Sequence, residues 1–220
     1  MKKINLFIFV IFIALWSDEA FAQFANDGSY LWNSASITYY SPNDKTEVYF
    51  GNKDHFSNQI KRLDYYHFEV IGYHKLSKRF SLGIGVRQTE NYKSEDWNPG
   101  QTYMFYGVYV WNPWNIRIKF ANRLMAKTYK TSETNYGLDN VSNVDFFAHS
   151  TSLWPKPYLM DELFSSLDLL QLQTIRIYTG LHLFNKQYWG IDLYYCYWKA
   201  CSTADWNNYN VLGLSTKIKI

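Results

Sequence analysis

Acidic and basic side chains recur at alternate positions along the chain, opposite apolar residues. In the stretch IRIKF, residues 116–120, Arg117 and Lys119 share one face and three apolar side chains share the other. Such polar faces could form a binding or catalytic cluster, or a network that braces a narrow interior, because burying an unpaired charge is costly. Both signs are dispersed over many segments, which favours a bracing network over a binding or catalytic cluster. Its candidate members are Glu69, Arg87, Arg123, Glu162, Arg176 and Asp192.

One constellation has the residue types of a lipid hydrolase, which needs a serine beside a histidine that a carboxylate or amide orients. The stretch AHSTS, residues 148–152, offers His149 with Ser150 and Ser152, but Thr151 occupies the position that shares a face with His149. The chain has no H-E-x-x-H, P-loop, G-x-S-x-G or dinucleotide motif. We therefore assign no catalytic residue and expect neither an enzymatic activity nor a cofactor.

The N-terminus predicts export. Lys2 and Lys3 precede an apolar run over residues 4–16, and residues 20–22 read Ala-Phe-Ala, a cleavage site of the A-x-A kind. The run is shorter than the about 20 residues that a membrane-spanning helix needs. The expected division is a signal peptide over residues 1–22, cleaved after Ala22, and one domain over residues 23–220. An uncleaved anchor is the alternative.

The two cysteines, Cys196 and Cys201, leave a disulfide open, because an exported protein meets an oxidising environment. Cys196 lies in a predicted strand and Cys201 in the expected loop after it, so a bridge would require a sharp reversal of the chain. Neither cysteine has a companion cluster of histidine or cysteine, so no metal site is expected.

Alternation with a period of two dominates the rest of the chain, and no window has a sustained helical period. Aromatic residues make up 20% of the chain, which also favours strands. Most predicted strands have about the 9–11 residues that a tilted strand needs to cross a bilayer. They cover 30–40, 46–52, 63–75, 79–90, 102–111, 115–127, 143–153, 157–165, 173–184, 188–199 and 208–220.

The predicted connections alternate between short and long, as in outer-membrane barrels with tight turns at one end and long loops at the other. Aromatic pairs such as Tyr39 with Tyr40, Tyr65 with Tyr66, and Trp111 with Trp114 fall near strand ends, where membrane interfaces favour them. The pattern predicts an all-β, single up-and-down antiparallel transmembrane barrel of about 11–12 strands. Eleven strands would close in parallel, so residues 23–27 are a hypothetical twelfth strand.

Several motifs resemble the domain-of-unknown-function 2490 family in order and spacing over nearly all of the mature chain. The resemblance implies an outer-membrane-type β-barrel of Gram-negative bacteria with no assigned activity. The closing strand departs from the family by ending in Ile220, where an aromatic residue is common. The motifs are RLDYYH (62–67), LGIGVRQ (82–88), NRL (122–124), MDELF (160–164), RIYTGL (176–181), DLYYCYW (192–198) and W..YNVLGLSTKIKI (206–220).

The expected function is therefore structural, or the passage of small solutes, in the outer membrane of a Gram-negative bacterium. Outer-membrane lipid and the barrel-assembly machinery are the expected partners. The net charge is only +3 and the sequence has no basic cluster, so it gives no indication of nucleic-acid binding. Two alternatives stay open, namely the lipid hydrolase and a soluble lipocalin-like barrel whose apolar face would line a ligand cavity. Alternation cannot choose which face points inward, and the ligand or solute stays open.

Overall fold

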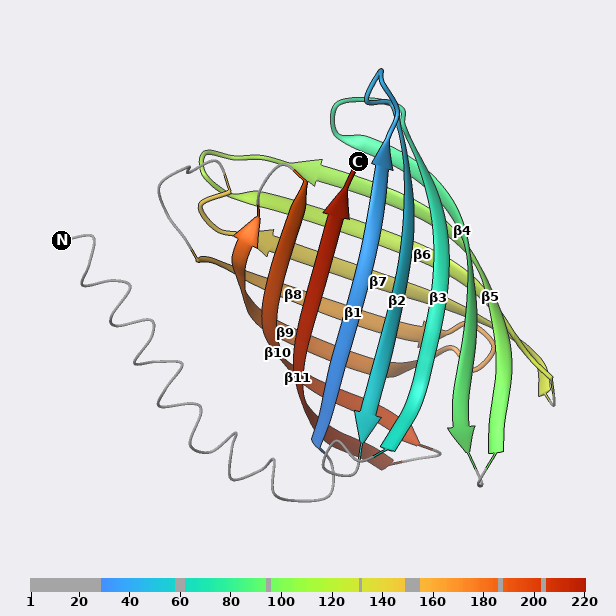
Figure 1. Ribbon diagram of the computed structural model, residues 1–220. Coiled ribbons are helices and arrows are strands. Elements are labelled where there is room, and N and C mark those ends of the chain that lie inside the picture. The colour runs from blue at the N-terminus through green and yellow to red at the C-terminus, as the bar shows by residue number, and fades with distance from the viewer. Residues whose placement is uncertain are drawn as a thin grey trace.

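The computed structural model describes residues 29–57, 62–93, 96–130, 132–148, 155–185, 188–202 and 205–220. These residues form an all-β fold (Figure 1). Within these ranges no helix is long and apolar enough to span a membrane. The strands are β1 Ser29–Tyr40, β2 Thr46–Ser57, β3 Arg62–Lys75, β4 Phe80–Lys93, β5 Asp96–Trp111, β6 Arg117–Tyr129, β7 Ser132–Asp145, β8 Lys156–Ser166, β9 Gln171–Asn185, β10 Trp189–Ser202 and β11 Asp205–Lys219.

The strands close into one barrel in which each strand pairs antiparallel with its neighbours in sequence. The seam is different, because β1 and β11 pair in parallel from Ser29 opposite Asn210 to Thr38 opposite Lys219. Figure 1 shows these two strands, in blue and red, side by side and pointing the same way. The predicted all-β barrel of about 11–12 strands with antiparallel neighbours is confirmed. It closes with eleven strands, and the hypothetical twelfth strand at residues 23–27 lies outside the described residues.

The predicted sorting of connections into short and long is wrong. At the end of the barrel that carries Ile220, called here the C-terminal end, residues 146–155 connect β7 to β8. At the opposite end the connections are short, such as residues 94–95 and 203–204. The polar segments that were expected as loops continue the strands instead. Their side chains are polar on both faces, so they lack the apolar alternation by which a strand is recognised.

The largest error in strand position concerns β7. The sequence predicts a strand over residues 143–153, but β7 runs from Ser132 to Asp145. The expected loop between residues 128 and 142 is therefore the end of β6 and most of β7. Arg123 in β6 lies opposite Asp139 in this segment.

Cys196 and Cys201 are both free and both belong to β10, so Cys201 does not follow the strand in a loop. Five residues of extended strand separate two Cα atoms by roughly 16 Å, well beyond the reach of a disulfide. The bridge that the sequence left open is thus absent, and Cys196 is fully buried.

The two faces of the barrel wall differ in chemistry. Large apolar side chains such as Phe68, Ile84 and Phe105 are exposed on the outside, Ile84 to 69%. Charged and hydroxyl side chains from all strands line the inside. The C-terminal strand shows the same division, because Leu214 and Ile218 are exposed outside while Lys217 lines the interior.

Tyrosines in the interior pack over glycines of neighbouring strands. Tyr194 lies opposite Gly213, and a Cβ atom at Gly213 would lie 2.0 Å from the Tyr194 ring. Tyr158 covers Gly180 in the same way, with 2.4 Å between the ring and such a Cβ atom. The absence of a side chain at these positions gives the ring its space, so these cross-strand pairs fill the wall without narrowing the interior further.

Candidate functional site

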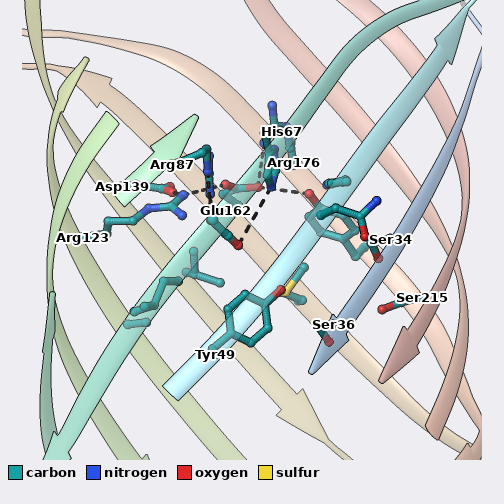
Figure 2. Close-up of a pocket in the computed structure, with 18 of the residues that line it drawn as sticks. Ser34, Ser36, Tyr49, His67, Arg87, Arg123, Asp139, Glu162, Arg176 and Ser215 are labelled. Carbon is teal, nitrogen blue, oxygen red and sulfur yellow. Dashed lines mark hydrogen bonds and ion pairs between the residues drawn. The ribbon is translucent and has the colours of Figure 1, made fainter. Parts of the chain in front are cut away.

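The barrel encloses a cavity of about 1090 Å³ that residues from every strand line. Its walls carry seven carboxylates, ten lysine and arginine side chains, and many tyrosines. Figure 2 shows the middle of this cavity, with charged side chains reaching inward from several strands. We take this interior as the candidate site, because it gathers most of the charged groups that the strands carry.

We call Glu69, Arg87, Arg123, Asp139, Glu162 and Arg176 the central ion cluster. Glu162 of β8 holds its largest part together, because it accepts hydrogen bonds from β9 and from β6. Its Oε2 accepts from Arg176 Nη1 at 2.9 Å and from the Tyr178 hydroxyl at 3.0 Å, and its Oε1 accepts from Arg123 Nη2 at 3.2 Å. Arg176 lies directly opposite Glu162 in the ladder, so register alone brings this pair together.

Asp139 is the most enclosed member of the central ion cluster, with a side chain 1% exposed. It lies opposite Arg123 in the ladder and forms an ion pair with it. Arg123 thus reaches across β7 to Glu162 of β8 while also pairing with Asp139 of β7. Replacing Arg123 with a neutral residue should therefore be costly, because it would leave two enclosed carboxylates without their counter-charge.

The third part of the central ion cluster is the pair of Glu69 and Arg87, which also lie opposite each other in the ladder. Arg87 donates from Nε and Nη2 to the same Glu69 oxygen, at 2.9 and 2.7 Å. His67 Nε2 lies 3.9 Å from the other Glu69 oxygen, and its Nδ1 lies 2.7 Å from the Tyr65 hydroxyl. Tyr65, His67 and Glu69 share one face of β3, because alternate residues of a strand point the same way.

Asp192 belongs to a separate group, which we call the C-terminal-end cluster: Asp145, His182, Asp192 and Lys217. Lys217 forms an ion pair with Asp192, and His182 Nδ1 lies 2.7 Å from the other Asp192 oxygen. His182 Nε2 lies 3.3 Å from Asp145. The histidine therefore bridges two carboxylates, and its ring is stacked on Tyr158 with 4.7 Å between centroids.

Sequence reasoning found five of the six central residues and missed Asp139. It also missed Lys53, which lines the same cavity from β2. Both residues lie between predicted strands, in segments 128–142 and 53–62. The available signal was parity: Asp139 is four residues from Asn143, and Lys53 is four from Tyr49, both of which line the cavity. Residues four apart in a strand share a face.

His149, Ser150 and Ser152, the residues considered for a lipid hydrolase, lie outside the described residues. In the part of the chain that the structure describes, no group of three or more His, Cys, Asp and Glu side chains could hold a metal ion. The arrangement in the cavity is one of paired charges and hydrogen-bond donors. Such an arrangement can bind, orient or exclude charged solutes.

Comparisons with known proteins add no relative. No family model matches the chain, and no curated protein matches it either. The resemblance to the domain-of-unknown-function 2490 family therefore stays a prediction from the motifs, and the structure and its chemistry carry the functional argument.

Proposed function

We propose that the chain is a membrane-spanning β-barrel of the outer-membrane type, acting as a structural protein or a narrow passage for small solutes, without enzymatic activity. The single observation that carries this proposal is the sidedness of the wall. Apolar side chains such as Ile84, Phe105 and Ile177 are exposed on the outside, while charged groups fill the inside. Contiguous exposed apolar surface of this kind is typical of a face that meets lipid.

The lipocalin-like alternative requires the opposite arrangement, with an apolar interior for the ligand and a polar surface for water. The interior here contains Arg87, Arg123, Glu162 and Arg176 at its centre. An apolar ligand would have to displace or desolvate these charges, which is costly. The sidedness thus supports the membrane barrel over the soluble one.

Exposed aromatic residues give further support. Trp111, Trp114, Tyr188 and Trp189 are exposed at the C-terminal end, and Trp206 is exposed at the opposite end. Rings at these levels suit the two interfaces of a bilayer. Not every aromatic residue near a strand end faces outward, because some line the cavity: Tyr40, Tyr65, Tyr158 and Trp198.

The outward face is not uniformly apolar. Asn122 of β6 is exposed and Asn140 of β7 is half-buried, and the Asn140 side chain donates to the Asn122 side chain at 2.7 Å. This hydrogen bond lowers the free-energy cost of placing the two amides against lipid, because it pairs one donor of Asn140 with the acceptor of Asn122. The polar pair is therefore compatible with a lipid-facing wall.

The central ion cluster bears on the choice between a structural role and passage. It reaches into the interior from β3, β4, β6, β7, β8 and β9, so a solute has to pass beside paired charges. Barrels of small strand number are filled largely by side chains. The proposed function therefore allows only small, polar solutes through the interior.

The proposal is tested by replacing an outward apolar residue with a charge. Ile84→Lys places lysine on the outward face of β4, where a lipid-facing lysine costs about 2–4 kcal/mol near mid-bilayer. We expect Ile84→Lys to reduce the fraction of protein that is recovered from outer-membrane detergent extracts and migrates faster unboiled than boiled. Leu76→Lys in the β3–β4 connection, where Leu76 is also exposed, is the matched control and should assemble like the unchanged protein. Recovery of the unchanged protein in the soluble periplasmic fraction would contradict the proposal.

A further inference from the structure

The centre of the cavity holds more positive than negative side chains. Three carboxylates, Glu69, Asp139 and Glu162, face five cations there. Three of these cations belong to the ion pairs described above, and the remaining two are lysines. Among the described residues no ion pair includes either lysine, Lys53 of β2 or Lys127 of β6.

Aromatic rings take the place of a carboxylate beside these lysines. Lys53 Nζ lies 3.9 Å from the ring centroid of Trp32, and Lys127 Nζ lies 3.9 Å from that of Phe164. A ring face attracts a cation but leaves most of the three ammonium N–H donors without an acceptor. The Lys53 ammonium therefore has N–H donors that are available to a ligand in the cavity.

Arg176 shares the Trp32 ring with Lys53 and also lies beside Trp198. Its guanidinium carbon lies 5.3 Å from the Trp32 centroid and 5.2 Å from the Trp198 centroid. Arg176 Nε and Trp198 Nε1 are both buried without a hydrogen-bond partner in the described structure. A buried donor without an acceptor is costly, so a group with several such donors is complementary to a ligand that brings acceptors.

Glu162 does not supply the missing acceptors. Its two oxygens already accept from Arg123, Arg176 and Tyr178, and they face two guanidinium groups. Ser34, which lies directly opposite Lys53 across neighbouring strands, adds a hydroxyl to the same stretch of cavity wall. Figure 2 labels both Ser34 and Arg176 among the residues that line the cavity.

We propose that the barrel interior binds a small dianionic oxyanion, of the phosphate or dicarboxylate class, between Lys53, Arg176 and Trp198. Its oxygens accept from the Lys53 ammonium, Arg176 Nε and the Trp198 indole N–H, and its charge balances the cation surplus. Guanidinium and ammonium donors to oxyanions form the stronger class of hydrogen bond. Membrane placement is not required for this site, so the site and the proposed function can fail independently.

The test measures binding of inorganic phosphate to the purified, folded full-length protein by titration calorimetry at fixed ionic strength. We expect saturable binding at one site that chloride does not reproduce. Lys53→Met should weaken it roughly tenfold or more through the loss of a charge-assisted hydrogen bond, while Lys53→Arg should retain most of it. Lys78→Met, which removes an exposed lysine in the β3–β4 connection, is the matched control and should leave binding unchanged.

Two outcomes would overturn the site. One is the absence of saturable phosphate binding to the unchanged protein, or a phosphate effect that chloride matches at equal ionic strength. The other is equal weakening by Lys53→Met and Lys78→Met, which would indicate general attraction to a positive chain. If Lys53→Met does not fold, as judged by its migration unboiled and boiled, the chloride comparison and Lys53→Arg decide the question.

Discussion

The central ion cluster and the C-terminal-end cluster both consist of carboxylates paired with cations, but their cations meet water to different degrees. Arg123 is 12% exposed and pairs with two carboxylates, whereas Lys217 is 43% exposed and pairs with one. Enclosed charges are poorly screened and costly to leave unpaired, while an exposed ammonium regains its hydration when a pair is broken. The difference teaches that similar ion pairs in one barrel should contribute very differently to its stability.

Both clusters use the strand ladder in the same way. Glu69 with Arg87, Arg123 with Asp139, and Glu162 with Arg176 are direct cross-strand partners, and so are His182 and Asp192. Register therefore sets the pairs in both places. What distinguishes the clusters is depth: the central pairs lie near the middle of their strands, and Asp145 and Lys217 lie near strand ends.

The largest effect should come from Glu162→Gln, which preserves shape but removes the charge between Arg123 and Arg176. We expect the free energy of unfolding to fall by about 3–5 kcal/mol, because two enclosed guanidiniums lose their shared counter-charge. Thermal unfolding in detergent, followed by circular dichroism, measures the change. The control is Glu133→Gln, at an exposed position of β7, which should change stability little. Equal effects of the two substitutions would show that the central ion cluster does not stabilise the fold.

A smaller loss is expected for Arg87→Met, which leaves Glu69 enclosed without its guanidinium partner. The free energy of unfolding should fall by about 2 kcal/mol, since a single buried carboxylate loses its hydrogen bonds. Lipid hydrolysis should be undetectable in both the unchanged protein and the variant. Arg79→Met, at an exposed position before β4, is the control for charge removal.

Arg87→Met also separates bracing from a constriction for solutes. Single-channel recordings in planar bilayers report the preference for cations or anions. A bracing role predicts lost stability with the ion preference of any surviving conductance little changed. A clear shift in ion preference without lost stability would instead assign Arg87 to a selective constriction.

Alternation predicted most of this architecture because one wall face is apolar and the other polar. Where that contrast exists, as around Glu69, Arg87, Glu162 and Arg176, both the strand and the inward direction of the side chain follow from the sequence. The contrast fails where both faces are polar, as in LDNVSN, residues 138–143. Backbone pairing with neighbouring strands holds that segment in β7, and a local pattern contains no information about this pairing. Asp139 was missed for that reason.

The grouping of the candidates was also beyond the sequence. Alternation places Asp192 and Glu162 on the same wall, but it does not say which strands are opposite at a given depth. That depends on register and on the tilt of the strands around the barrel. Asp192 therefore pairs with His182 and Lys217 near the C-terminal end, apart from the other candidates.

The smallest effect should come from Lys217→Met in the C-terminal-end cluster. Lys217 pairs with Asp192 but stays 43% exposed, so water and salt already weaken the attraction. Asp192 is enclosed, but it keeps His182 as a partner when Lys217 is replaced. We expect the free energy of unfolding to fall by about 0.5 kcal/mol at low ionic strength. The difference from the unchanged protein should shrink further in high salt, whereas the loss in Glu162→Gln should persist there because its partners are enclosed. Unfolding measured for both variants at low and high salt checks this contrast. A loss in Lys217→Met as large and as insensitive to salt as that in Glu162→Gln would show that exposure of the cation does not separate the two clusters.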